Sequence, residues 1–424
     1  MYTQLRETFQ AIGAQRAATT VSAGRPRVAG NVLALGLTSL FTDISSEMVS
    51  AVLPLYFLTV LLMSPLQFGV LDGLYQGIGA LVRLSGGMAA DRSGRYKEVA
   101  ALGYALSAVT KVGLLAAGGV WGLLAALTVV DRTGKGIRTA PRDALISLSS
   151  RREELGMAFG VHRALDTAGA MIGPVIAFAL LSMAPNAFDA IFVASFCAAI
   201  IGLGVLLLFV ENRRAPAADT AARVSLRAAL RLLAEPRFRA MAVAGTVLGL
   251  ATISDGFVYV VLQRRLEFNI GLFPLLYVAT SAAYLLLAVP AGWLADRIGR
   301  GRVFVGGYGL LLLVYVLLLR PDLGPGGLVA CVLIFGSYYA ATDGVLMALG
   351  SEVLPTALRS SGLGLLTTAT NLSRLAASVL FGALWTWWSA DTAVLVQTVS
   401  LGVAILVATY ALVRAGGGVG APAE

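Results

Sequence analysis

The sequence predicts an all-α membrane protein whose twelve transmembrane helices form two pseudo-symmetric six-helix bundles. Of the 424 residues, 58% are hydrophobic and 13% are charged, whereas soluble domains carry about 25% charged residues. Apolar segments long enough to cross a bilayer recur along the chain, and patterns of the first half return in the second. A soluble chain of this composition could not cover its surface with polar groups, so much of that surface must face lipid.

Twelve apolar segments account for the expected spans, because a helix needs about 20 residues to cross the hydrocarbon core. The first six cover residues 31–59, 67–90, 98–117, 120–146, 157–182 and 188–210. The second six cover 240–262, 270–294, 302–319, 326–349, 359–386 and 392–414. The chain therefore divides into a cytoplasmic tail (1–30), a first bundle (31–210), a linker (211–239), a second bundle (240–414) and a C-terminal tail (415–424).

Basic residues indicate how the chain crosses the membrane. They cluster in the N-terminal tail, the turn after the second span, the linker and the turn after the eighth span. The opposite loops carry few, with Arg264, Arg265 and Arg320 as exceptions. Since cytoplasmic loops are enriched in arginine and lysine, we expect a multi-pass protein of the inner (cytoplasmic) membrane with both termini in the cytoplasm. The linker is either solvated or partly an amphipathic helix on the inner leaflet.

A repeated motif links the two halves. A Gly-x-x-x-Asp-Arg-x-Gly-Arg pattern ends the second span and returns 205 residues later. Its members are Gly87, Asp91, Arg92, Gly94 and Arg95, and then Gly292, Asp296, Arg297, Gly299 and Arg300. Parallel repeats of six helices are typical of transporters that hold a solute near the membrane midplane.

This repeated turn resembles the signature of the major facilitator superfamily, and the resemblance extends over essentially the whole chain. It implies the major facilitator fold and transport by alternating access. The glycine allows close helix contact, the aspartate can pair with basic groups, and the arginines can latch the cytoplasmic side. The motif is therefore expected to form a gate, and it does not identify a substrate.

Two further motifs support the resemblance. Residues 132–140 are similar to a fourth-helix pattern that the family associates with proton coupling, but Lys135 replaces the usual glutamine and Arg138 a glycine. These replacements favour a role in substrate binding. Gly169, Gly173 and Pro174 match part of a fifth-helix pattern that is frequent in antiporters, especially drug exporters. Mid-helix glycine and proline also indicate a closely packed, bendable helix on physical grounds.

Charged residues within the expected spans are candidates for function, because placing them in a membrane is costly. Asp43 and Glu47 lie one turn apart on the first span, so both can face one cavity. Asp255 lies near midplane in the seventh span. We expect these carboxyl groups to bind substrate or protons. The alternative for the first two is neutralisation by neighbouring basic side chains. Arg83 and Lys111 are plausible partners for Asp43, Glu47 or Asp131.

The fourth span carries the most charge. Four of its charged residues fall within about 60° of one helix face. They are Asp131, Lys135, Arg138 and Arg142, and Arg132 adjoins them. Such a stripe must line a cavity or pair with neighbouring helices, since lipid cannot face it. Its excess of cations favours an anionic or zwitterionic solute, for which Arg138 offers a bidentate fork. Alternatively, Arg138 and Arg142 bind only head groups or the gate.

The fifth span contains the chain's only histidine. Histidine has an unperturbed pKa near 6.5, which suits a proton switch. His162 and Asp166 are one turn apart and can touch. Because His162 lies close to the helix start, a hydrogen-bonded structural role is the alternative. Asp166 lies deeper and is the better candidate for a proton carrier.

Together these features predict a secondary active transporter of a small organic solute, coupled to protons. Anionic or zwitterionic solutes are favoured, including siderophores and other organic anions, and the direction of transport stays open. The alternatives are a proton/drug antiporter exporting lipophilic or cationic compounds, a non-transporting sensor or scaffold, and a membrane enzyme. The sequence has no nucleotide-binding motif or metal-ligand spacing, so we expect no enzyme, cofactor or metal. Expected partners are the solute, protons and membrane lipids, without nucleic acid, and the protein is expected to be monomeric.

Overall fold

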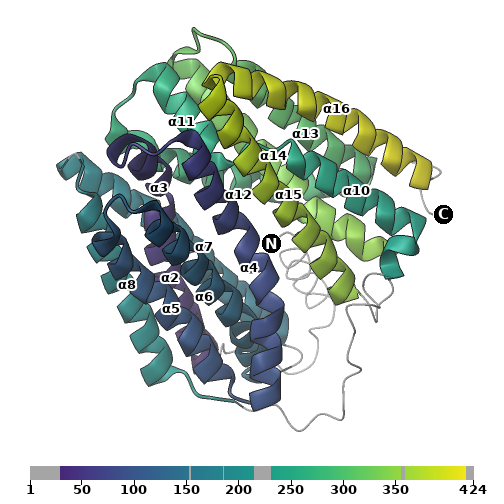
Figure 1. Ribbon diagram of the computed structural model, residues 1–424. Helices are drawn as coiled ribbons and strands as arrows, with labels where there is room; N and C mark the ends of the chain where they lie inside the picture. Colours follow the sequence, from purple (N-terminus) through teal and green to yellow (C-terminus); the bar gives the residue numbers. More distant parts are fainter. Residues whose placement is uncertain (1–28, 152–153, 185, 214–230, 355–358, 417–424) are drawn as a thin grey trace. The chain divides into compact units, whose positions relative to one another are not determined.

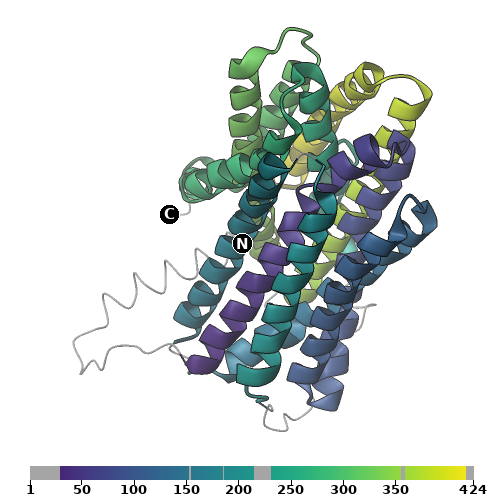
Figure 2. The same ribbon diagram turned by 90° about the vertical axis from the view of Figure 1, so that its left-hand side faces the viewer.

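The computed structural model describes residues 29–151, 154–184, 186–213, 231–354 and 359–416. Within these ranges it leaves undescribed the side chains at 80, 83–89, 91–92, 359–361 and 415–416. Across the described ranges the chain forms helices and connecting turns, with no β-strand (Figures 1 and 2). Helices suit a bilayer because each satisfies its own backbone hydrogen bonds. Most of the expected amphipathic linker helix lies outside the described residues.

The first half of the chain forms six helical spans. The first joins α2 (Gly30–Ser50), α3 (Leu53–Leu55) and a π-helical turn, η1 (Tyr56–Val60). The others are α4 (Pro65–Ser93), α5 (Tyr96–Ala117), α6 (Trp121–Leu148), α7 (Leu155–Met183) and α8 (Phe188–Phe209).

The second half repeats this number of spans. After a turn, η3 (Leu232–Ala234), its first span is divided into α10 (Pro236–Leu250) and α11 (Asp255–Leu266). A second turn, η4 (Ile270–Leu272), leads into the remaining helices. These are α12 (Phe273–Ile298), α13 (Arg300–Leu318), α14 (Gly324–Val353), α15 (Arg359–Trp387) and α16 (Ala390–Gly416). The predicted fold class is confirmed, and each predicted span limit lies within four residues of the observed one.

Nine of the described helical segments are long and apolar enough to cross a membrane. Helices α4, α6 and α15 fall outside this group in the described part of the chain. Helix α6 carries six charged residues between positions 131 and 143, which lowers its mean hydropathy. A helix of this kind is tolerated in a bilayer only when its charged face is turned away from lipid.

The described residues fall into two compact units, and each unit is considered by itself. The first contains residues 29–56 and 78–213. In it α2 packs against α7 and α8, and α5 packs against α6. The predicted helix-bend motif of α7 lies at the first of these contacts. A Cβ atom at Gly173 would lie 2.6 Å from the Ile44 carbonyl oxygen, and Gly169 meets the Leu40 backbone in the same way. Glycine is needed there because the two backbones touch.

The second unit contains residues 57–77 and 231–416. Helix α14 packs against α12 and α13, and α10 packs against α15 and α16. Residues 57–77 lie against α15, where a Cβ atom at Gly69 would lie 2.5 Å from the Ser378 carbonyl oxygen. The boundary between the two units therefore falls inside α4, whereas the domain limits expected from the sequence stay a prediction.

The sequence predicted one continuous helix at 240–262, but the helix is interrupted between Leu250 and Asp255. The interruption leaves backbone groups that need hydrogen-bond partners inside a membrane. Tyr315 of α13 supplies them: its hydroxyl accepts from the Ile253 N–H at 2.5 Å and donates to the Ala251 carbonyl at 3.3 Å. The break places Asp255 at the start of α11, where the helix dipole favours a negative charge.

Candidate functional site

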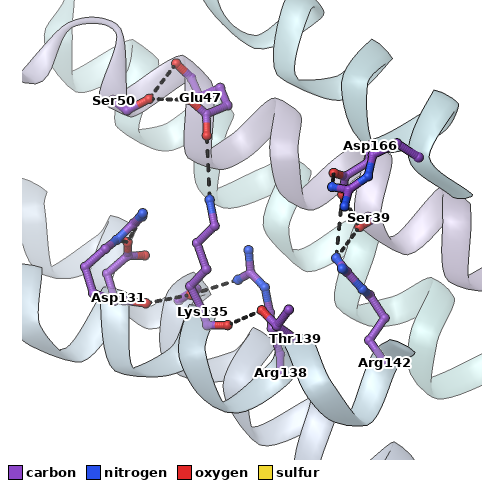
Figure 3. A network of polar contacts seen from close by, with 12 residues as sticks. Ser39, Glu47, Ser50, Asp131, Lys135, Arg138, Thr139, Arg142 and Asp166 are labelled. Carbon is purple, nitrogen blue, oxygen red and sulfur yellow. Dashed lines mark hydrogen bonds and ion pairs between the residues drawn. The ribbon is translucent and has the colours of Figure 1, made fainter. Parts of the chain in front are cut away.

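The first unit gathers its charged side chains around α6. Figure 3 shows Lys135 pointing from α6 toward Glu47 of α2, with Arg138 beside it and Arg142 pointing toward Ser39 and Asp166. The stripe predicted on the fourth span thus faces α2, α5 and α7, which its ion pairs reach. The charged side chains of this stripe differ in how closely a group of opposite charge is paired with each of them.

Asp131 belongs to a buried ion cluster between α5 and α6. Its Oδ1 accepts from the Lys111 Nζ at 2.9 Å and from the Thr110 hydroxyl at 3.2 Å, and its Oδ2 accepts from the Arg132 Nε at 2.9 Å. The three charged residues are 3–7% exposed. Lys111 is thus a partner of Asp131, one of the options that the sequence left open. Both carboxylate oxygens are satisfied, so this cluster can fix the two helices to one another.

Arg138 differs from the other cations of α6. It is 3% exposed, and its NH1 donates to the Ser107 hydroxyl at 2.9 Å. Its guanidinium lies 4.7 Å from the ring centre of Tyr104, close enough for a cation–π contact. Among the described residues no carboxylate forms an ion pair with it. The remaining N–H groups keep the fork that binds carboxylates and phosphates.

Lys135 and Glu47 form a loose pair beside Arg138. The Lys135 Nζ lies 3.8 Å from the Glu47 Oε1, and the two side chains are 40% and 29% exposed. Glu47 also accepts from the Ser50 hydroxyl at 2.8 Å. A partly exposed pair at this distance is weak, so either member can be redirected to a ligand at small cost.

A second network lies one turn further along α6, around Asp166 of α7. Asp166 accepts from the Ser39 hydroxyl at 2.8 Å and from the Arg163 NH1 at 3.2 Å. Arg142 lies 3.6 Å from Asp166, and its NH2 donates to Asp143 at 2.9 Å. These contacts hold Arg142 between two carboxylates and neutralise it.

Asp43 of α2 adjoins this network, because its carboxyl group is within hydrogen-bonding reach of Asp166. Two carboxyl groups that meet can share a proton. His162 also lies nearby and is 3% exposed, yet neither ring nitrogen has a hydrogen-bond partner among the described residues. The structure therefore does not show the expected contact between His162 and Asp166.

The repeated turn motif, which was predicted to form a gate, is described more fully in its second copy. Arg300 donates to Asp296 at 3.0 Å and also pairs with Glu352 of α14. The Arg297 guanidinium lies 3.6 Å from the ring centre of Trp293. Gly292 is buried on α12. Gly299 follows the helix with a φ of 102°, a conformation that favours glycine. Glu352 lies more than fifty positions from Asp296, so sequence spacing gave no signal for this partner.

The first copy of the motif is described only in part. Gly94 takes a φ of 62° at the end of α4, as the repeat would require. Arg95, which follows it, is exposed. The side chains at Gly87, Asp91 and Arg92 lie outside the described residues.

The second unit contains a cavity of about 150 Å³ enclosed by α11, α12 and α14. Two carboxylates and four tyrosines contribute to its lining: Asp255, Asp343, Tyr259, Tyr277, Tyr284 and Tyr339. The Tyr339 hydroxyl donates to Asp255, and the Tyr259 hydroxyl donates to Thr280 at 2.7 Å. The sequence indicated Asp255, but the tyrosines of α12 and α14 carried no signal because ring convergence depends on tertiary packing.

Comparisons with known proteins agree with this architecture. The model of the Major Facilitator Superfamily matches residues 35–278 and 250–423. The chain is 30% identical over 365 residues to an uncharacterized MFS-type transporter of Methanocaldococcus jannaschii, covering 84% of this chain and 88% of that one. It is 27% identical over 359 residues to an uncharacterized protein of Mycobacterium tuberculosis, covering 82% and 84%.

Solved structures show the same fold at low sequence identity. A peptide transporter crystallised with sulfate superposes with a TM-score of 0.76 at 16% identity, covering 95% of this chain and 98% of that one. A nucleoside transporter superposes with a TM-score of 0.75 at 16% identity, covering 90% and 99%. The family match extends over both halves, and the helices, the repeated turn and the charged α6 agree with it. The chain belongs to the major facilitator superfamily and is a multi-pass membrane transporter.

Proposed function

We propose that this transporter moves a small anionic or zwitterionic organic solute by alternating access and couples its movement to protons. The observation that carries the proposal is Arg138, a buried guanidinium with no carboxylate partner among the described residues. Leaving a charge unpaired in a membrane is costly. A negatively charged group of the solute supplies the missing partner.

The surroundings of Arg138 suit such a group. The Ser107 hydroxyl accepts from one guanidinium nitrogen, and the Tyr104 ring lies against the guanidinium group. The side chain is therefore fixed while its other N–H donors stay available. Lys135 is partly exposed beside it, and its ammonium group forms a single ion pair with the described residues, the 3.8 Å contact with Glu47. A carboxylate or phosphate therefore finds one rigid fork and one mobile ammonium group.

Proton coupling is assigned to the pair formed by Asp43 and Asp166. These carboxyl groups are within hydrogen-bonding reach, and Arg142 lies 3.6 Å from Asp166. A solute anion that enters beside Arg138 changes the field at this pair, because charges interact strongly where the dielectric constant is low. Release or uptake of the shared proton is the proposed link to the gradient.

The test uses the purified full chain in liposomes that contain a pH-sensitive dye. Anionic, zwitterionic, neutral and cationic solutes are added in turn across an imposed pH gradient. We expect proton movement with anionic or zwitterionic solutes, and its loss in Lys135→Gln and Arg138→Gln. Arg320→Gln serves as the matched control, because Arg320 is exposed in the turn before α14, and it should behave as the unsubstituted protein.

Two results would overturn the proposal. Proton movement triggered only by lipophilic cations would replace it with drug antiport. Unchanged movement in Arg138→Gln would remove the anion site. A separate variant, Asp43→Asn, tests the coupling step: it should abolish accumulation driven by the gradient while solute binding persists, and unchanged accumulation would exclude Asp43 as the proton carrier.

A further inference from the structure

The cavity of the second unit has a chemistry opposite to that of Arg138. Asp255 and Asp343 contribute carboxylates to it, and aromatic rings from α11, α12 and α14 surround them. Its volume of about 150 Å³ is enough for several water molecules or one small organic group. It lies within a single unit and does not depend on the residues of the proposed anion site.

Within the part of the chain that the structure describes, neither carboxylate forms an ion pair with a basic side chain. Asp255 accepts a hydrogen bond from the Tyr339 hydroxyl, which is neutral. Asp343 is exposed and forms no hydrogen bond or ion pair among the described residues. The cation that acts on both is Arg374 of α15, but its hydrogen bond goes to the Tyr338 hydroxyl at 3.3 Å. The cavity therefore keeps a net negative charge.

The tyrosines are arranged as a rigid aromatic wall. The rings of Tyr259 and Tyr277 meet edge to face with centres 4.6 Å apart, and Tyr259 also contacts Phe335 at 5.9 Å. The Tyr259 hydroxyl is held by Thr280. Aromatic faces beside carboxylates are the combination that recognises ammonium groups, through cation–π attraction and charge. Two carboxylates are fewer oxygen ligands than a calcium cage requires.

We propose that this cavity binds the ammonium group of an organic cation or zwitterion. The carboxylates of Asp255 and Asp343 compensate its charge, and the tyrosine rings contact its methyl or methylene groups. This binding of an ammonium group does not depend on the anion site of the proposed function.

The experiment measures binding by calorimetry to the detergent-solubilised full chain. The probe is choline, and its neutral isostere 3,3-dimethylbutan-1-ol has the same shape without the charge. We expect choline to bind and the isostere to bind at least about tenfold more weakly. Asp255→Asn and Asp343→Asn should each weaken choline binding about tenfold or more. Asp322→Asn is the matched control, because Asp322 is exposed outside the cavity, and it should bind choline normally.

Two variants of Tyr277 distinguish a loss of the binding site from misfolding. Tyr277→Phe keeps the ring and should retain choline binding, whereas Tyr277→Leu should weaken it. Equal binding of choline and its isostere, or unchanged binding in both carboxylate variants, would overturn the inference. Failure of the two proposals is distinguishable, since Arg138→Gln should leave choline binding intact while it abolishes transport of anionic solutes.

Discussion

The ion cluster around Asp131 gives the sharpest prediction of stability. Asp131→Asn removes a carboxylate that is 7% exposed and accepts from Lys111 at 2.9 Å and from Arg132. The substitution leaves two buried cations side by side without an anion. Breaking a buried ion pair by removing one partner costs about 3–5 kcal/mol. Because both cations lose their partner here, we expect a value at the upper end of this range.

The assay is thermal unfolding of the solubilised protein, followed by tryptophan fluorescence. A loss of about 5 kcal/mol lowers Tm by roughly 10 °C or more if the first unit unfolds as one domain of ordinary size. Asp131→Asn combined with Lys111→Met should recover part of that loss, because one of the stranded charges disappears. Recovery in the double variant measures the coupling between the two side chains.

A Tm for Asp131→Asn equal to that of the unsubstituted protein would refute the reasoning. It would show that water or lipid head groups reach the cluster and screen it. If transport were lost at unchanged Tm, Asp131 would act on solute or protons, as its position in the charged stripe of the fourth span predicts. The two readouts therefore separate a structural role from a transport role for the same side chain.

Three further predictions follow from single contacts. His162→Leu should keep or raise Tm and leave proton-coupled uptake intact, because neither ring nitrogen is hydrogen-bonded within the described chain; a fall in Tm or a loss of coupling would contradict this. Tyr315→Phe should destabilise the protein by about 1–3 kcal/mol, since the Ile253 N–H loses its partner, and an unchanged melting curve would argue against it. Glu352→Gln should change Tm little, because its pair with Arg300 is half-exposed; an altered maximal transport rate at constant KM would identify a gate, and an altered KM would exclude a purely gating role.

Most of the fold followed from the sequence because hydropathy is a local property. Twenty apolar residues specify a span wherever they occur, and the repeated turn identified the two halves. The interruption before α11 could not be predicted this way. The segment from Ala251 to Ser254 has neither glycine nor proline, and its open backbone groups are satisfied by Tyr315, which lies more than sixty positions away.

The candidate site was predictable to a similar degree. Helical spacing placed Lys135, Arg138 and Arg142 on one face of α6, and the structure connects that face to α2 and α7. The spacing could not show which charges are neutralised. Arg142 is held by two carboxylates, whereas Arg138 has none among the described residues. That difference depends on which neighbouring helix faces each turn of α6, and it therefore appears only in the structure.

The charged side chains that lack a close ion-pair partner bear on the class of solute that the transporter binds. A charged side chain in a close, buried ion pair gives up its partner only at a cost, so it is a poorer candidate for a cycle of binding and release. Charged groups without a close partner are better candidates. Among the described residues these include the Arg138 cation in the first unit and, in the second, the Asp343 carboxylate, which lines the cavity with Asp255. Each unit therefore has its own requirement: an anionic group compensates the Arg138 side chain, and an ammonium group compensates the carboxylates of the cavity. A substrate panel of anions, cations and zwitterions tests the two requirements separately.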